Sequence, residues 1–198
     1  RDVPVHEEVL GKLARENEPF IKQWIVNIND QEINLEALLF RLRQRISNRA
    51  NVELKGDKLG LYICSLSSKT IVYKGMVRSE ILAPFYTDLK DERFEVSFAV
   101  YHRRFSTNTL PKWPLAQPMR LLGHNGEINT LLGNINWAKA TETDLGSVWK
   151  DHANDLKPIV NNLFSDSANL DLTLELLVRS GRPITDSLLT LIPEAFRD

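Results

Sequence analysis

The chain has 198 residues, which can form one fairly large domain with a sizeable hydrophobic core. Its 25 basic and 26 acidic residues give a formal net charge of −1, and this balance excludes a general electrostatic attraction to nucleic acid or to membranes. The single cysteine, Cys64, excludes an internal disulfide and a zinc site with several thiolates, and it favours a reducing compartment.

The first third of the chain predicts two helices and a strand. Apolar spacing over 5–17 indicates a short helix that ends before Pro19, and alternating side chains over 21–28 indicate a strand. Asn34 has the side chain of an N-cap, and an apolar stripe at helical spacing follows it. The stripe consists of Leu35, Leu38, Leu39, Leu42 and Ile46. Four arginines fall mainly outside this stripe, which predicts a solvated face rather than an anion site. They are Arg41, Arg43, Arg45 and Arg49.

From residue 60 onward the pattern becomes typical of strands. Residues 61–66 and 70–76 are rich in β-branched and aromatic side chains, and the polar residues 67–69 between them predict a hairpin. Alternation over 94–101 predicts another strand, which ends at His102, Arg103 and Arg104. A short strand over 119–122 then leads into the dipeptide Asn125-Gly126.

Helices dominate the predictions for the rest of the chain. Apolar spacing predicts a helix over 127–139, and the Ser165-Asp166-Ser167 cluster predicts the start of a second helix that ends at Gly181. A last helix is predicted over 183–191. Strands with helices before and after them predict an α+β fold in which helices cover a largely antiparallel sheet stack. We expect all of residues 1–198 to be part of a single domain.

Asn125-Gly126 has two alternative interpretations. On spacing alone, Asn-Gly is typical of a two-residue hairpin turn. The helical spacing that follows it favours a corner between a strand and a helix, which hairpins do not form. At such a corner the Asn125 amide and the Gly126 backbone N–H can point at one oxyanion, and glycine has no Cβ to block a substrate carbonyl.

Arg104 and Asp166 are candidates for binding the two ends of an α-amino acid. An arginine fork binds a carboxylate through two hydrogen bonds, and a carboxylate binds an ammonium group. A surface ion pair for Arg104 and a helix cap for Asp166 are the structural alternatives. We assign His124 a packing or orienting role. Cys64 is expected to be a buried structural residue rather than a nucleophile, because no cationic neighbour in sequence lowers its pKa.

Three runs of residues resemble the glutaminase domain of glutamate synthase. They are YHRRFSTNT at 101–109, WPLAQP at 113–118 and GHNGEINT at 123–130. Shorter matches extend the resemblance over nearly the whole chain, and it is strongest from about residue 60. These lie at 62–67, 73–76, 165–167, 174–177 and 179–182.

The resemblance implies a class II, N-terminal-nucleophile amidotransferase with a four-layer αββα fold, here incomplete at the N-terminus. In that family a cysteine at the mature N-terminus attacks the carboxamide of glutamine, and its own α-amine is the base. Because the chain begins with Arg1, we expect this cysteine to lie upstream and the fragment alone to be inactive. By the same resemblance, Arg104 binds the glutamine α-carboxylate and Asp166 its ammonium. Asn125 and Gly126 form the oxyanion hole, and Thr107 lines the pocket.

The resemblance also implies cofactors and partners for the complete enzyme. Ammonia passes to a downstream synthase region that makes glutamate from 2-oxoglutarate with FMN and an iron–sulfur cluster, and no cofactor or metal is expected within this segment. The residues at 103–105 (RRF) and 113–114 (WP) resemble the ferredoxin-dependent enzymes of cyanobacteria and plastids more than the NADPH-dependent form. We therefore expect ferredoxin, or an NADPH-oxidising subunit, as a partner. The expected location is the cytoplasm of a prokaryote or the plastid stroma.

Two other functions remain open from the sequence. The first is an amino-acid-binding module without catalysis, which is consistent with the missing nucleophile. The second is another class II amidotransferase, such as a phosphoribosyl or glucosamine enzyme, although the run at 113–118 is not typical of those families.

Overall fold

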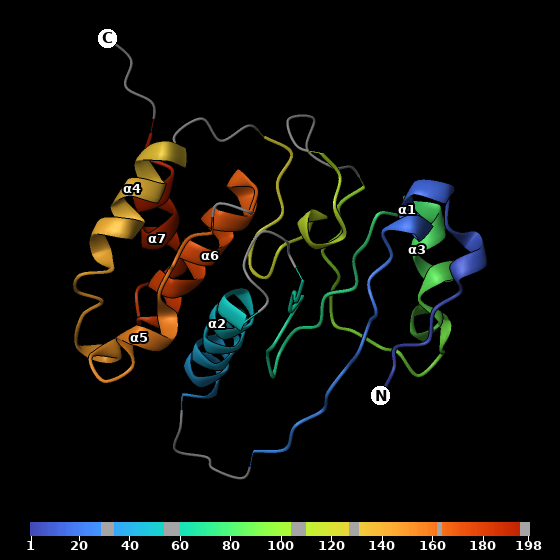
Figure 1. Ribbon diagram of the computed structural model, residues 1–198, viewed down its shortest axis with the longest axis horizontal. Coiled ribbons are helices and arrows are strands. Elements are labelled where there is room, and N and C mark those ends of the chain that lie inside the picture. Colours follow the sequence, from blue (N-terminus) through green and yellow to red (C-terminus); the bar gives the residue numbers. More distant parts are fainter. Residues whose placement is uncertain (29–33, 54–59, 104–109, 127–130, 162–163, 195–198) are drawn as a thin grey trace. The chain divides into compact units, whose positions relative to one another are not determined.

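The computed structural model describes residues 1–28, 34–53, 60–103, 110–126, 131–161 and 164–194 (Figure 1). Its internal contacts divide the chain into two compact units. The first comprises Arg1–Glu32, Val72–Pro118 and Gly123–Asn125, and the second comprises Ile33–Ile71, Met119–Leu122 and Gly126–Asp198. Each unit has a hydrophobic core of its own. The prediction that residues 1–198 belong to a single domain is not decided by this division and stays a prediction.

Short helices around an aromatic core make up the first unit. They are η1 (Glu7–Val9), α1 (Lys12–Glu16), α3 (Ser79–Phe85), η2 (Thr87–Lys90) and η3 (Trp113–Leu115). The helix predicted over 5–17 is therefore present as two short pieces. Phe85, Tyr86 and Trp113 are buried, and the Trp113 indole Nε1 donates a 3.1 Å hydrogen bond to the backbone oxygen of Ala14. A Cβ at Gly75 would collide with the Trp113 ring, so this close approach requires glycine.

The second unit is a cluster of helices around α6. Its elements are α2 (Leu35–Glu53), α4 (Leu131–Thr141), η4 (Ser147–Trp149), α5 (Ala153–Leu156), α6 (Asp166–Arg179) and α7 (Ile184–Leu191). Helix α6 packs against α2, α4 and α7, and Figure 1 shows it between these neighbours. Residues 167–176 of α6 are all buried. An α-helix that is buried on every side holds whatever polar side chains it carries away from water.

Local signals in the sequence correctly predicted the start of α2 and both ends of α6. The Asn34 side chain accepts a 3.2 Å hydrogen bond from the Ala37 backbone N–H at the start of α2, as predicted for an N-cap. Ser165 caps α6 in the same way, by accepting a bond from the Ala168 N–H. After α6, Gly181 has a φ of +94°, a left-handed conformation that favours glycine and ends the helix. Helix α4 is present from Leu131, while its predicted start at 127–130 lies outside the described residues.

The predicted α+β fold with four αββα layers is wrong for this structure. Within the described ranges, β-pairing is limited to two isolated bridges, Asp2↔Lys22 and Val5↔Tyr86, and the regular elements are helices. The strands predicted over 21–28 and 94–101 are extended segments without a ladder, and Trp24 and Phe98 are each 75% exposed. Alternating side chains predict an extended backbone, but a strand also requires a partner, which the local sequence does not specify.

The predicted hairpin at 61–76 and the strand at 119–122 are wrong for the same reason. The turn at 67–69 is present, since the Ser67 hydroxyl accepts bonds from the N–H groups of Lys69 and Thr70, but the flanking segments do not pair as strands. At 119–122 the Met119 N–H donates to the Leu122 oxygen at 2.7 Å, which closes a tight turn. The backbone N–H groups of 119–122 that a strand would use for pairing are therefore bonded otherwise, to Leu122 and Asp171.

Candidate functional site

The predicted oxyanion corner, Asn125-Gly126, is exposed, and polar contacts hold the residue before it. Asn125 and Gly126 are both exposed, and nothing lies within 4 Å of the position a Gly126 Cβ would take. The preceding residue, His124, donates its backbone N–H to the Gln117 Oε1 at 2.9 Å, and its backbone oxygen lies 2.9 Å from the His102 Nε2. His124 thus contributes its backbone to these contacts, and the packing or orienting role of its side chain stays a prediction.

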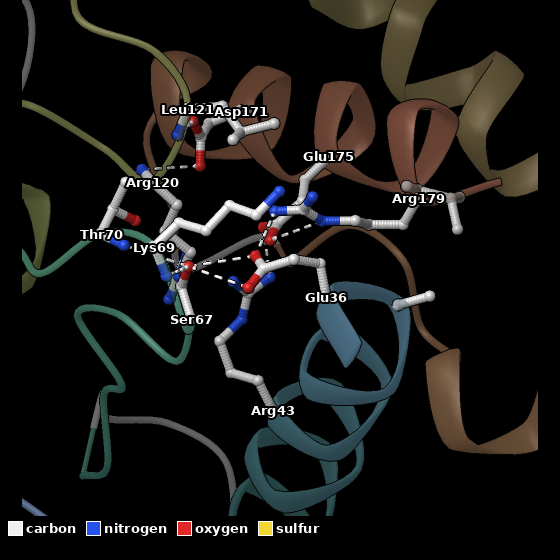
Figure 2. A network of polar contacts seen from close by, with 12 residues as sticks. Glu36, Arg43, Ser67, Lys69, Thr70, Arg120, Leu121, Asp171, Glu175 and Arg179 are labelled. Atoms are coloured by element: carbon white, nitrogen blue, oxygen red, sulfur yellow. Dashed lines mark hydrogen bonds and ion pairs between the residues drawn. The ribbon is translucent and has the colours of Figure 1, made fainter. Parts of the chain in front are cut away.

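A buried carboxylate holds the residues just before this corner. Asp171, in the middle of α6 and 0% exposed, accepts hydrogen bonds from three consecutive backbone N–H groups. Its Oδ2 accepts from Arg120 at 3.1 Å, and its Oδ1 accepts from Leu121 at 2.8 Å and from Leu122 at 2.9 Å. Figure 2 shows the Asp171 side chain directed from α6 towards Arg120 and Leu121. Burial raises the pKa of Asp171, and the Leu121 N–H and the Arg120 charge only partly oppose this shift.

The Arg120 side chain links this turn to the segment that contains Cys64. Its guanidinium lies 5.0 Å from the centre of the Tyr62 ring and donates a hydrogen bond to the backbone oxygen of Ile63. Arg120 is also close enough to Cys64 to interact with it electrostatically. The sequence had suggested no cationic neighbour for Cys64, and this one comes from a residue far away in the chain. Cys64 itself is half-buried.

Asp166 is the first residue of α6 and is exposed. The helix-cap alternative for Asp166 does not apply, because Ser165 provides the cap. A carboxylate in the first turn interacts favourably with the helix dipole, whichever ligand it binds. Its predicted role in binding an ammonium group stays a prediction.

The structure does not bring all the predicted site residues together. Arg104 and Thr107 lie outside the described residues. Asn125 belongs to the first unit, whereas Gly126 and Asp166 belong to the second. The assignment of these five residues to one glutamine site therefore rests on the motifs in the sequence.

The similarity of the chain to known proteins decides its family. A family model described as class-II glutamine amidotransferases matches residues 1–198. The chain belongs to this family. It is 53% identical over 200 residues to ferredoxin-dependent glutamate synthase of Pyropia yezoensis and 53% identical over 204 residues to ferredoxin-dependent glutamate synthase 2 of Synechocystis sp.. A chloroplastic/mitochondrial relative from Arabidopsis thaliana, ferredoxin-dependent glutamate synthase 1, is 50% identical over 201 residues. In each case 100% of the chain is matched, and it spans 12% to 13% of the relative's length.

Part of the predicted arginine face in this amidotransferase chain is buried in an ion-pair network. Arg43 is 1% exposed, and its guanidinium lies 2.6 Å from the Glu175 carboxylate of α6. Burial and the nearby Arg120 charge lower the pKa of Arg43, while Glu175 opposes the shift. The solvated-face prediction is therefore wrong for Arg43, although Arg45 and Arg49 are exposed as expected. The buried face of α2 runs through Leu39, Phe40 and Arg43, and this placement leaves Ile46 of the predicted apolar stripe 45% exposed.

Glu36 joins the network from the start of α2. Its carboxylate accepts hydrogen bonds from the Ser67 hydroxyl and from both the backbone N–H and the hydroxyl of Ser68. It also lies 3.0 Å from the Arg179 guanidinium, and Figure 2 shows its contacts with Ser67 and Arg179. Burial alone would raise the pKa of Glu36. The hydrogen bonds from Ser68 and Ser67 together with the Arg179 charge outweigh burial, so the pKa is lowered. The network thus anchors the turn at 67–69 to α2 and α6.

Sequence reasoning missed Asp171 and Arg120. One signal for Asp171 was present: it stands between Leu170 and Leu172 in an apolar run, with Glu175 one turn later. Acidic residues inside a fully buried helix require partners, which pointed to a polar contact but not to its identity.

Neither a membrane-spanning helix nor a metal-binding cluster is present in the described part of the chain. None of the helices found there is long and apolar enough to cross a membrane. In the same residues there is no group of three or more His, Cys, Asp and Glu side chains that could hold a metal ion.

Proposed function

We propose that the chain is the glutaminase segment of a glutamate synthase, which hydrolyses glutamine and supplies ammonia for the reductive synthesis of glutamate from 2-oxoglutarate. The observation that carries this proposal is the similarity of the whole chain, at about half of all positions, to ferredoxin-dependent glutamate synthases. The match to the class-II amidotransferase family over residues 1–198 supports glutamine as the substrate.

Each site residue has a distinct chemical role in this proposal. Arg104 binds the glutamine α-carboxylate through a two-pronged contact, and Asp166 binds the α-ammonium group. Attack by a cysteine thiolate on the side-chain amide carbon converts its carbonyl oxygen to an oxyanion. The Asn125 side-chain amide and the Gly126 backbone N–H stabilise that charge as it develops. Thr107 lines the pocket. The C–N bond then breaks, the nitrogen leaves as ammonia after taking up a proton, and water hydrolyses the thioester to glutamate.

The nucleophile in this proposal is a cysteine outside the chain and not Cys64. A nucleophilic cysteine of this class needs an amine or another base within hydrogen-bond reach. The resemblance assigns the role of base to the free α-amine of an N-terminal cysteine, and Cys64 lies within the chain, where its nitrogen is part of a peptide bond. Because Arg120 lies close enough to Cys64 to interact with it, a Cys64→Ser variant is the direct test of this assignment.

The cofactors and partners of the complete enzyme are also proposals. FMN and an iron–sulfur cluster would supply the electrons for the reductive step when bound in other regions. The chain cannot hold such a cluster on thiolates alone, because it contains one cysteine and a cluster needs about four ligands. We propose ferredoxin rather than NADPH as the electron donor, because the relatives cited above are named as ferredoxin-dependent. The cytoplasm of a prokaryote or the plastid stroma is the proposed location.

The test uses the complete enzyme and measures two reactions separately. Ammonia release from glutamine reports the glutaminase reaction, and glutamate formation from 2-oxoglutarate and added ammonia reports the synthase reaction. We expect both, with the first abolished by a glutamine-analogue electrophile and the second retained. Glutamine binding without ammonia release would instead favour an amino-acid-binding module. Transfer of the ammonia to an acceptor other than 2-oxoglutarate would indicate another class II amidotransferase.

A further inference from the structure

We propose that Asp171 is a positioning residue for amide hydrolysis, because its carboxylate holds the backbone of residues 120–122 and so fixes the base of the corner that carries Asn125 and Gly126. This inference rests on the proposed glutaminase function. Asp171 itself touches no substrate in this account. It acts through the peptide groups that it binds.

The contact has the geometry of an anchor rather than a helix cap. Asp171 is the sixth residue of the 14-residue helix α6, far from the N-terminal groups that a cap would satisfy. Its two oxygens accept three consecutive N–H groups at 2.8–3.1 Å, all from a segment some 50 positions earlier in the sequence. Three bonds to adjacent peptides restrain both the position and the orientation of that backbone. Hydrogen bonds to a charged acceptor are also about twice as strong as those between neutral groups.

Asn125 and Gly126 are not packed themselves, so their position depends on how the residues before them are held. Asn125 and Gly126 are exposed, and Gly126 has open space around its Cα. At the base, Leu121 and Leu122 pack against the cluster of Leu170, Leu174 and Leu191. Asp171 adds the hydrogen bonds that orient their peptide groups. Oxyanion donors work only within about 2.7–3.1 Å of the developing charge, and a shift of about 1 Å can lower the rate about a hundredfold.

The same helix carries another residue of the predicted site. Asp166 and Asp171 lie five positions apart on α6, and so about 7.5 Å apart along its axis. The helix fixes the spacing between them, because residues 167–176 are buried on all sides. One helix of the second unit therefore holds both the 120–122 backbone and the carboxylate proposed to bind the substrate ammonium.

Glu175 provides a matched control for this proposal. It lies one turn after Asp171 on the same helix, it is buried, and its carboxylate pairs with Arg43 rather than with the 120–122 backbone. Asp171→Asn and Glu175→Gln each remove one buried negative charge with almost no change in shape. In Asp171→Asn one acceptor oxygen becomes an NH₂ group, which faces backbone N–H donors and cannot accept from them. In one rotamer the Arg120 bond is lost, and in the other the Leu121 and Leu122 bonds are lost.

The experiment measures glutamine hydrolysis and ammonia-dependent glutamate synthesis in the complete enzyme and both variants. For Asp171→Asn we expect kcat for glutamine hydrolysis to fall roughly ten- to a hundredfold, with KM within about threefold of the parent and ammonia-dependent synthesis unchanged. For Glu175→Gln we expect lower thermal stability and an unchanged kcat. A kcat for Asp171→Asn within about twofold of the parent, or an equal loss in Glu175→Gln, would overturn the positioning role.

A second variant decides the matter if Asp171→Asn does not fold. Asp171→Glu keeps the charge and both acceptor oxygens but displaces them by one methylene, so we expect a reduced kcat at nearly constant KM. A kcat equal to that of the parent would overturn the proposal. Failure of the underlying function is recognised separately, because then the parent enzyme itself releases no ammonia from glutamine.

Discussion

The buried pair of Arg43 and Glu175 offers the sharpest test of how the second unit is held together. The two side chains are 1% and 4% exposed and 2.6 Å apart. Replacing Arg43 by methionine keeps the apolar length of the side chain but leaves the Glu175 carboxylate buried without its main partner. Breaking a buried pair in this way costs about 3–5 kcal/mol. Because the Arg179 Nε remains 3.8 Å from Glu175, we expect a value near the lower end, about 3 kcal/mol.

Hydrogen exchange in the complete enzyme measures this loss locally. Amides in α2 and α6 should exchange roughly a hundredfold faster in Arg43→Met, since each 1.4 kcal/mol changes the open population about tenfold. The control is Arg49→Met on the same helix, whose pair with Glu53 is exposed. It should change exchange by less than roughly threefold, because exposed pairs contribute little.

A double variant tests the origin of the effect. Arg43→Met combined with Glu175→Met removes both charges together, and stability should return to within about 1–2 kcal/mol of the parent, since apolar residues of similar volume often replace a buried ion pair. Equal exchange rates in Arg43→Met and Arg49→Met would refute the burial of the pair. A double variant no more stable than Arg43→Met would refute the argument from an uncompensated charge.

Three further predictions concern catalysis in the complete enzyme. Asn125→Ala should lower kcat for glutamine hydrolysis by roughly 10² to 10³, the usual loss for one oxyanion donor; steady-state kinetics that show a loss under about fivefold would remove Asn125 from the mechanism. Arg104→Lys should mainly raise KM for glutamine, because lysine cannot reproduce the two-pronged contact, while synthesis from added ammonia survives. If both reactions collapsed together, Arg104 would be a structural residue. Cys64→Ser should leave ammonia release unchanged, and a covalent adduct of a glutamine-analogue electrophile on Cys64 together with turnover would place the nucleophile within this chain.

Residue-level signals for the predicted site came from short, contiguous motifs. The corner at 123–126 and the Ser165–Ser167 cluster can be read locally, and the cluster does begin a helix capped by Ser165. Arg104 and Thr107 lie outside the described residues, so their positions are known only as places in a motif. The anchoring contact of Asp171 joins residues about 50 positions apart, and no local pattern predicts which backbone a buried carboxylate will bind.

The sequence by itself determined the family and the helices α2, α6 and α7 of the second unit. Motifs such as GHNGEINT are contiguous, and helix ends depend on neighbours within one turn, as the Asn34 cap and the Gly181 stop illustrate. Only the tertiary structure decided that alternating segments such as 94–101 remain unpaired in the described chain, because strand pairing depends on residues distant in sequence. It also decided that Arg43 is buried: helical spacing places a side chain on a face, but the neighbouring elements determine whether that face meets water or, as here, the carboxylate of Glu175.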